Sequence, residues 1–366
     1  MLPFDLQEIE RPRVLRLAES ALANDARAIT SATNPRSRGG PHDFSSEGDY
    51  WWPDPWDPDG PYVRRDGLTN PDNFVGHRQL MFAMADDVAA LAAAFRITRD
   101  EHFAAAAVHH MRVWFVDSAT RMNPDLRYAQ SIRGVTSGRG TGIIDTVHLC
   151  EVALAIETLR ESRALSGAYN EALTAWFRDY LAWMRTSPNG IEARDTPNNH
   201  ATCWTLQASA FAHLTGNTRV LRDCRRRFKK VLLPRQMDHD GSFPRELART
   251  KPFGYSMFHL SVMAALARLL STRRENLVTY AGPDGRGVLL GIEFLLPYLV
   301  DKTTWPYPRD VMHWNDWPVR QPALLFGALA IGRKSWLELW HRLDPDPVVA
   351  EVRRNFPIRQ PVLWMV

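Results

Sequence analysis

Two amides and an imidazole stand side by side near the middle of the chain, in the stretch DTPNNHATCW at 195–204. Asn198, Asn199 and His200 lie where a polar loop enters an apolar stretch with helical character. Asparagine is among the best residues for capping a helix, which explains one amide but not two followed by a histidine. An amide donates hydrogen bonds without titrating, and an imidazole exchanges protons close to neutral pH. We therefore treat this stretch as a candidate active-site segment.

A second polar segment, GSFPRELARTKPFGYSMFHL at 241–260, approaches another apolar stretch in the same way. It contains Arg245, Arg249 and Tyr255. A phenol, whose ordinary pKa is about 10, is an acid, and it becomes a base only where nearby positive charge lowers that pKa. Taken singly, the arginines would be surface residues and the tyrosine a core residue. Their placement at a second loop–helix junction favours a shared site.

Other chemistries find less support in the sequence. His109 and His110 point to different faces of a helix, and neither H-E-x-x-H nor C-x-x-C occurs, so we expect no metal and no cofactor. GRGTG at 138–142 follows no strand and lacks the Lys-Ser/Thr of a phosphate-binding loop. Paired carboxylates would serve a glycoside hydrolase. Sequence alone cannot pair the candidates, which are Asp54, Asp57, Asp59, Asp145, Glu192 and Asp310.

The elements that must position these residues read as helices. Apolar residues recur at helical spacing in about nine or ten stretches, and strand alternation is absent. These stretches are 77–98, 100–117, 143–160, 169–187, 200–217, 218–236 (ending at a proline), 254–272, 285–301 and 321–343, with a helix also expected near the N-terminus. The prediction is one all-α domain over 1–366, in which antiparallel helical hairpins close into a bundle or toroid.

Two long irregular segments interrupt the helices, at 49–72 and 298–322. Both are rich in Pro, Asp and Trp, and structureless segments of this length inside a domain are usually functional. We expect them to gather at one end of the helices and to build a cleft. Tryptophan faces in such a cleft would stack on flat ligands, although half or more of these side chains would simply anchor the segments.

Composition excludes several classes of protein. Hydrophobic residues make up 45% of the 366 residues, which rules out a disordered chain. The net charge of +4 suits an acidic substrate, and the densest basic stretch, RDCRRRFKK at 222–230, fits the solvated face of a helix, so no nucleic acid is expected. No apolar run approaches the ~18 residues of a membrane span. The cysteines, Cys150, Cys203 and Cys224, are expected to be buried apolar residues.

The polar segments resemble those of the alginate lyase family of helical polysaccharide lyases. NNHATCW at 198–204 is similar to that family's Asn-Asn-His segment, and ELARTKPFGYSMFHL at 246–260 to its Arg–Tyr segment. The stretches at 50–72 and 123–149 extend the resemblance over most of 50–260. The Arg249–Tyr255 spacing of six, against seven expected in the founding mannuronate lyases, is nearer the branch that includes glucuronan lyases. The resemblance implies an incomplete α/α toroid with a deep cleft and an acidic polysaccharide as substrate.

The implied reaction is β-elimination on a β-1,4-linked uronate polymer, glucuronan or poly-mannuronate. A clamp must spread the charge that develops when the C5 proton leaves, and a base and an acid must handle that proton and the leaving O4. We assign Asn199 as carboxylate neutraliser, His200 as second neutraliser or base, Tyr255 as base and acid, and Arg249 as electrostatic support. His200 and Arg249 would supply the charge that lowers the pKa of Tyr255.

The resemblance also implies substrate-binding residues. Gln130 matches a cleft glutamine of the family, and Tyr128 lies in the same YAQ segment. Arginines can pair with uronate carboxylates. The full set of expected substrate-binding residues is Gln130, Tyr128, His148, Trp51, Trp52, Arg64, Arg65, Trp204, Trp305 and Trp314.

Two other functions stay open at this point, a glycoside hydrolase on a similar toroid and a non-catalytic carbohydrate-binding protein. Localisation is open as well. The resemblance implies a periplasmic or secreted protein, whereas the N-terminal stretch lacks the apolar region of a signal peptide and would fit a cytoplasmic protein if Met1 is the native start.

Overall fold

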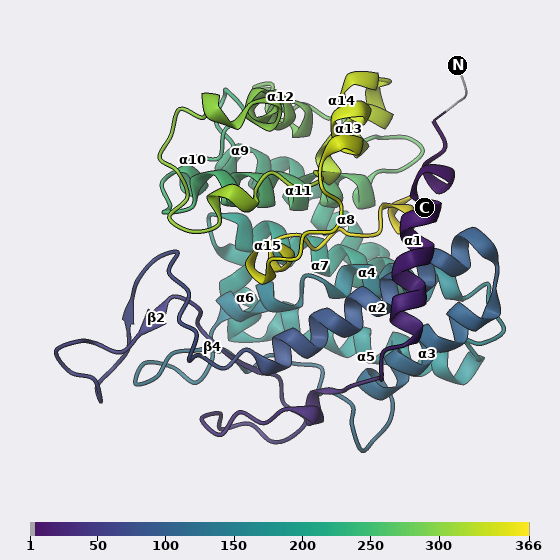
Figure 1. Ribbon diagram of the computed structural model, residues 1–366, viewed down its shortest axis with the longest axis vertical. Coiled ribbons are helices and arrows are strands. Elements are labelled where there is room, and N and C mark those ends of the chain that lie inside the picture. The colour runs from purple at the N-terminus through teal and green to yellow at the C-terminus, as the bar shows by residue number, and fades with distance from the viewer. Residues whose placement is uncertain (1–3, 366) are drawn as a thin grey trace.

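The chain folds into two concentric arcs of helices, and the computed structural model describes residues 4–365 (Figure 1). Neighbouring members of the inner arc pack against one another in chain order: α2 (Gly76–Thr98), α4 (Leu149–Leu159), α7 (Asn199–Leu214), α11 (Pro252–Leu270) and α13 (Pro322–Ile331). The outer arc consists of α1 (Leu6–Leu22), α3 (Glu101–Phe115), α5 (Gly167–Thr186), α8 (Thr218–Arg227), α12 (Val288–Val300) and α14 (Lys334–Arg342). This is the expected all-α, incomplete α/α toroid.

Burial explains the two arcs. Inner helices such as α7 and α11 are buried on nearly every face, as expected for helices that are apolar all round. Outer α8 buries only Val220 and Cys224, and its Arg219, Arg222 and Arg226 are exposed. By length and composition α11 could cross a membrane, but 89% of its most apolar window is buried inside the protein, which fits a core helix. All three cysteines are buried and unbridged, as expected.

Several helix boundaries differ from the sequence-based expectation. The stretch 143–160 begins as the 3-10 helix η2 (Gly140–Thr146) before α4. The stretch 321–343 divides into α13 and α14 because Gly332 adopts a left-handed conformation, with φ +70°, that ends a helix. In the stretch 218–236, α8 is followed by a π-helical turn, η3 (Phe228–Leu232), and then by α9 (Leu233–Gln236). The helical path therefore continues past Pro234 and does not stop there. Pro234 is accommodated in the first turn of α9, where a missing N–H costs little.

Four short strands, which sequence periodicity did not indicate, lie in residues 4–365 and shape the long loops. Strand β1 (Ser45–Glu47) runs parallel to β4 (Tyr128–Ser131), and β2 (Trp51–Trp52) pairs with β3 (Val63–Arg64) in an antiparallel hairpin. The hairpin projects from the helical body, at the left of Figure 1. The short helices α6 (Pro188–Asp195) and α10 (Pro244–Leu247) stand directly before α7 and α11 respectively.

The C-terminal segment crosses the helical body, drawn in yellow in Figure 1. Its last turn, η6 (Pro361–Trp364), packs on α2 and α4. A single carboxylate oxygen of Glu151, on α4, accepts the backbone N–H groups of Arg359 and Gln360 at 2.9 and 2.8 Å, and the indole N–H of Trp364 at 2.9 Å. This anchor brings α15 (Ala350–Arg354) to the open end of the toroid.

Candidate active site

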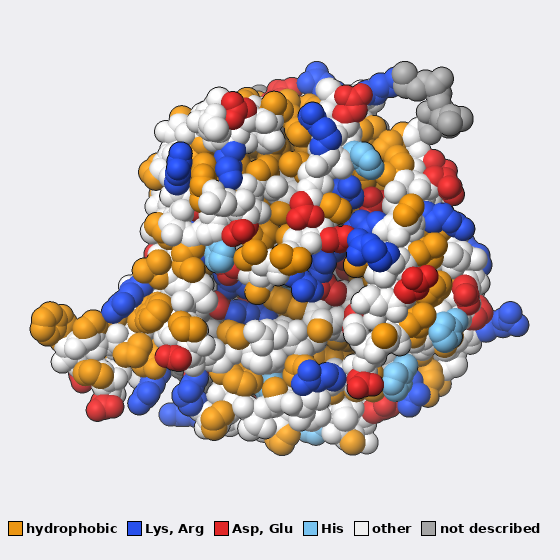
Figure 2. Space-filling view, in the orientation of Figure 1, with side chains coloured by type: hydrophobic (Ala, Val, Ile, Leu, Met, Phe, Trp, Pro, Cys, Tyr) orange, Lys and Arg blue, Asp and Glu red, His pale blue; other side chains and the backbone are white. Residues whose placement is uncertain are grey.

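A cavity of about 300 Å³, here called the active pocket, lies at the open end of the toroid. The same face of the molecule is hollowed in the space-filling view, with charged side chains in the hollow (Figure 2). Segments far apart in the sequence form its walls: Asp49–Trp51, Arg64, Gln130, Arg139, Thr141, Ile144, Asp145, Thr196–His200, Arg249, Tyr255, Phe258, Arg354 and Asn355. All four residues assigned to catalysis from the sequence, Asn199, His200, Arg249 and Tyr255, are therefore brought together.

The two amides of the Asn-Asn-His segment have different roles. Asn198 is the N-cap of α7, and its side-chain oxygen accepts the backbone N–H of His200 at 3.4 Å. Asn199 is clamped by Glu246 on α10, to which it donates its backbone N–H at 2.9 Å and its side-chain N–H at 2.8 Å. The remaining amide oxygen of Asn199, Oδ1, is buried without a partner. The clamp thus fixes the orientation of an amide that still has hydrogen-bonding capacity for a ligand.

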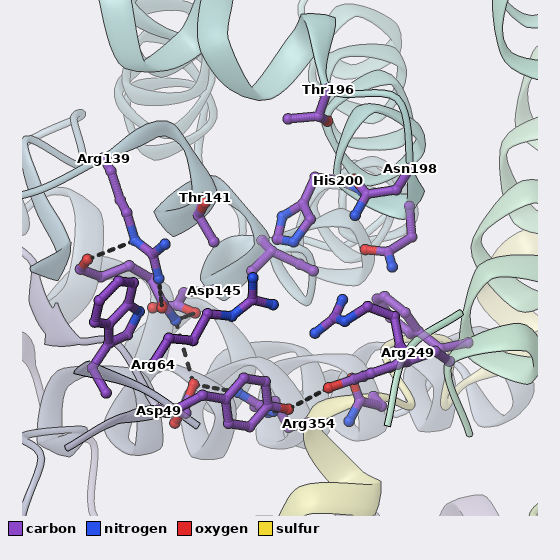
Figure 3. Close-up of a pocket in the computed structure, with 18 of the residues that line it drawn as sticks. Asp49, Arg64, Arg139, Thr141, Asp145, Thr196, Asn198, His200, Arg249 and Arg354 are labelled. Atoms are coloured by element: carbon purple, nitrogen blue, oxygen red, sulfur yellow. Dashed lines mark hydrogen bonds and ion pairs between the residues drawn. The ribbon is translucent and has the colours of Figure 1, made fainter. Parts of the chain in front are cut away.

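His200 points into the active pocket beside Arg64 and Arg249 (Figure 3). Burial, reinforced by nearby arginines, lowers its pKa to about 4, although Glu246 opposes the shift. The imidazole is therefore neutral at neutral pH. This overturns the expectation that His200 supplies positive charge, because sequence alone could not reveal how deeply the ring is desolvated. Its Nδ1 atom is buried without a partner, so the ring is free to serve a bound ligand.

Tyr255 lies in the first turn of α11, and its hydroxyl is 2.6 Å from the hydroxyl of Tyr50. The Tyr50 hydroxyl also accepts a hydrogen bond from Arg354 at 3.1 Å and lies 3.3 Å from Glu351. Burial and the neighbouring Tyr50 raise the pKa of Tyr255 well above its ordinary value, whereas Arg249 lowers it. Tyr255 is thus a protonated phenol at neutral pH, and the expected lowering of its pKa does not occur.

Arg249 and Arg64 share one carboxylate. Asp66 accepts Nη2 of Arg249 at 2.7 Å and Nη2 of Arg64 at 2.6 Å, which holds both guanidinium groups at the pocket. Arg249 also lies over the Tyr255 ring, 4.5 Å from its centroid. Positive charge at this distance stabilises a phenolate more than a phenol. Arg249 is therefore placed for the electrostatic support assigned to it.

The floor of the pocket is a buried charge network. Arg78 contacts Asp49 at 2.5 Å and Asp145 at 3.3 Å, and Gln130 donates to Asp145 at 3.0 Å. Gln130 has a left-handed backbone, with φ +55°, which is uncommon for a residue other than glycine, and its side-chain oxygen accepts from Arg139 at 3.2 Å. Gln130 lines the pocket as expected, but its side chain is already engaged in orienting charged groups.

The same network argues against hydrolysis by paired carboxylates. A glycosidase needs one carboxyl group that stays protonated as the general acid. Burial raises the pKa of Asp49, but Arg354 and Arg78 outweigh this effect and hold it well below the usual range. Asp145 is tied to Arg78, Gln130 and the hydroxyl of Ser46, the last at 2.6 Å. The acidic residues of the pocket thus act as counter-ions to its arginines.

Seven of the residues expected to bind substrate lie away from the active pocket. Tyr128 packs against Gly39, and Arg65 lies over the ring of Trp52 rather than in the pocket. His148 is buried, its ring is tilted by 35° against that of Phe82, and it contacts the backbone oxygen of Arg354 at 3.1 Å. Each of these contacts holds a loop or a helix in place. A single sequence cannot distinguish this structural role from a role in substrate binding.

The other tryptophans outside the pocket serve similar purposes. The indole N–H groups of Trp204 and Trp305 donate to backbone oxygens of Met184 and Pro308, and Trp314 stands beside Lys302. Only Trp51 and Arg64 of the expected aromatic and arginine set line the pocket with Gln130. Trp51 lines the pocket and is half-buried, so its indole is the candidate stacking surface, and Arg139 lies over the ring at 5.7 Å from its centroid.

Sequence reasoning missed several residues of the site, namely Asp49, Tyr50, Asp66, Arg139, Glu246 and Arg354. Tyr50 adjoins the Trp51–Trp52 cluster, so its position gave a signal that was not followed. Arg354 lies in the C-terminal segment, for which no motif stood out. Within residues 4–365 no group of three or more His, Cys, Asp or Glu side chains is arranged to hold a metal ion.

Comparisons with known proteins agree with this architecture. The sequence profile of the family described as Alginate lyase matches residues 28–305. An alginate lyase from Bacteroides ovatus superposes with a TM-score of 0.82 at 30% identity, covering 96% of this chain and 93% of that one. Alginate lyase A1-III from Sphingomonas species A1 superposes with a TM-score of 0.59 at 16% identity, covering 95% and 93%, and shares the fold.

A variant of alginate lyase A1-III complexed with tetrasaccharide gives a similar superposition, with a TM-score of 0.59 at 15% identity over 95% of this chain and 93% of that one. No curated protein sequence matches the chain significantly. The family profile spans most of the chain, and the Bacteroides structure is similar over nearly its whole length. The chain therefore belongs to the alginate lyase family, and it is a polysaccharide lyase.

Proposed function

We propose that the protein cleaves a β-1,4-linked polyuronate whose H5 and O4 lie on the same face of the ring, as in poly-mannuronate and glucuronan. The observation that carries this proposal is the arrangement around Tyr255. The phenol of Tyr255, whose hydroxyl is 2.6 Å from that of Tyr50 and whose ring lies beneath Arg249, lines the same pocket as Asn199 and His200. One such group can serve both proton transfers when both atoms lie on one face of the sugar.

The arginines and amides would bind the uronate carboxylate. Arg64 and Arg249 both reach the pocket, and each retains hydrogen-bonding capacity beyond the shared Asp66. Asn199 can offer the second hydrogen of its clamped amide. Hydrogen bonds to the carboxylate strengthen as charge spreads onto it from C5. Neutral His200 adds a donor or acceptor without repelling the arginines.

The proton then follows a short route. Tyr255, as phenolate, removes the C5 proton; the C4–O4 bond breaks, a C4=C5 double bond forms, and the departing O4 takes the proton from Tyr255. The proton taken from C5 is thus returned to O4, and one of the two polysaccharide fragments ends in a 4,5-unsaturated uronate. Because burial and the neighbouring Tyr50 raise the pKa of Tyr255, its phenolate must be stabilised by the positive charges of Arg249 and Arg354, which lower that pKa. These two charges are the basis of the base assignment.

Guluronate sets the boundary of this proposal. Its H5 and O4 lie on opposite faces, so a second group would have to be the base, and His200 is the available one. The experiment is to incubate the protein with poly-mannuronate, glucuronan, poly-guluronate and hyaluronan, and to follow the ultraviolet absorbance of the unsaturated product. We expect the fastest rise on poly-mannuronate or glucuronan. A fastest rise on poly-guluronate would overturn the assignment of Tyr255 as sole proton carrier.

A further inference from the structure

A second cavity of about 410 Å³, here called the basic groove, lies on the outer surface between the C-terminal end of α5, α6 and α8. Its charged lining consists of Arg185, Arg194, Arg226, Arg227, Lys230, Asp195 and Asp223. Cations thus exceed carboxylates by three, while the whole chain has a net charge of only +4. Exposed Arg235 adds to the excess, since its charge acts on Asp195 and Arg227.

The excess charge in the basic groove is not neutralised by the protein itself. Asp195 pairs with Arg194 at 2.6 Å and lies 3.6 Å from Arg227, and Asp223 pairs with Arg226 at 2.8 Å. Arg185 and Lys230 are exposed, and within residues 4–365 neither has a carboxylate at ion-pair distance. A concave surface lined by uncompensated cations attracts anions and concentrates them.

The position of the basic groove relates it to the active pocket. Arg194 and Asp195 line the groove, and the next residues along the chain, Thr196, Pro197 and Asn198, line the pocket. The five-residue segment 194–198 thus contributes to the lining of both cavities. A long polymer that leaves the pocket across this segment meets the groove, whereas a short oligosaccharide confined to the pocket does not.

We propose that the basic groove is a distal binding surface for the acidic polysaccharide, holding the part of the chain that extends beyond Thr196–Asn198. This inference rests on the proposed function for the chemistry of the polymer, a repeating carboxylate. Isolated carboxylates bound at exposed arginines and lysines gain little each, so the surface favours a polymer that presents many of them at once. The groove raises affinity for long chains and leaves the chemical step unchanged.

The test compares two double variants that remove the same charge. Arg185→Gln with Lys230→Gln alters the basic groove, and Arg163→Gln with Arg342→Gln removes two exposed cations that line neither cavity. We expect the groove variant to raise KM for long poly-mannuronate about threefold or more at low salt, with kcat unchanged, because rim charges govern encounter and its salt dependence. KM for a tetrasaccharide should stay the same in both variants.

Binding is measured separately, so that the groove can be judged without turnover. Each double variant, made in the inactive Tyr255→Phe background, is run through native gels containing poly-mannuronate, and melting temperatures verify folding. Weaker retardation of the groove variant than of the control variant supports the inference, even if no polyuronate is cleaved and the proposed function fails. Equal retardation of the groove and control variants would overturn it. Retardation by single-stranded DNA as strong as that by poly-mannuronate would overturn the assignment to polysaccharide.

Charge reversal provides a stronger version of the same test. Arg185→Glu with Lys230→Glu places two carboxylates where a polyuronate would lie, and both positions are exposed, so the fold is retained. Retardation by poly-mannuronate should be weaker than in the Arg185→Gln with Lys230→Gln variant, at low and at moderate salt alike. Retention of wild-type mobility shifts in this variant would contradict the inference directly.

Discussion

The active pocket and the basic groove are both rich in arginine, but they differ in how that charge is balanced. In the pocket, Arg249 and Arg64 share Asp66, and Arg354 is paired with Asp49 and Glu351. In the groove, Arg185 and Lys230 have no such partner within residues 4–365. Paired charges are fixed in direction and suit a transition state, whereas uncompensated charges act at longer range and suit capture of a polymer.

The difference predicts that pocket variants change the chemical step and groove variants change only the use of long substrates. Arg249→Gln should lower kcat about 100-fold or more, the scale seen when one preorganised electrostatic group is removed. It removes the charge over the Tyr255 ring while keeping a polar but shorter side chain. Arg245→Gln is the control, because Arg245 is exposed, lies one turn earlier, and does not line the pocket. Equal kcat values in both variants would contradict the claim that the paired charges of the pocket act on the chemical step.

The pH dependence should identify the base. The pKa of Tyr255 lies above its ordinary value, so below that pKa each added pH unit increases the phenolate population about tenfold. We therefore expect kcat/KM to rise from neutral to alkaline pH. His200 has a pKa of about 4 and stays neutral throughout that range. A flat profile between neutral and mildly alkaline pH would instead favour His200 as the base.

Arg354 tests whether the C-terminal segment belongs to the working site. It donates to the Tyr50 hydroxyl, which in turn contacts Tyr255. Losing a hydrogen bond to a charged group typically costs at least 1.5 kcal/mol, so Arg354→Gln should lower kcat about tenfold. Arg354→Lys should recover part of that loss and shift the alkaline limb of the pH profile less. A variant that melts earlier but keeps kcat and its pH profile would show a purely structural role.

The smallest effect concerns salt. At ionic strengths near 1 M the screening length falls to about 3 Å, so the contribution of the exposed groove is removed while the buried pocket pairs persist. We expect KM for long poly-mannuronate to rise severalfold between low and high salt. KM for a tetrasaccharide should change far less. A parallel rise for both substrates would mean that the groove adds nothing beyond the pocket.

The sequence was sufficient for the helical architecture because helical periodicity is local. Stretches such as 77–98 and 254–272 fold within two residues of their expected starts. The predicted helix boundaries were wrong where a helix-ending residue interrupts an apolar pattern. At Gly332, for example, α13 ends although the apolar pattern continues. The parallel pairing of β1 with β4 joins residues 45 and 128. Such pairing depends on tertiary contacts that no short window of sequence contains.

The four catalytic candidates line one pocket, and they were assigned because their residue types suit the chemistry and because the two segments that carry them resemble those of the family. The supporting residues were harder to predict. Glu246 acts through Asn199 and Asp66 through Arg249, so each is an ordinary carboxylate until its partner is known. Protonation states were also beyond reach, since the pKa of His200 depends on burial. Trp204 and Trp305 do not line the active pocket, and an indole packed in a core looks the same in sequence as one in a cleft.

The central claim is that Tyr255 carries the proton in β-elimination of a polyuronate. The most direct measurement is the ultraviolet absorbance of unsaturated uronate released from poly-mannuronate and glucuronan by the wild type and by Tyr255→Phe. Phenylalanine keeps the ring beneath Arg249 and removes only the hydroxyl, so the fold is preserved. We predict a steady rise with the wild type and a rate at least about 100-fold lower with the variant. An equal rise with both proteins would contradict the account.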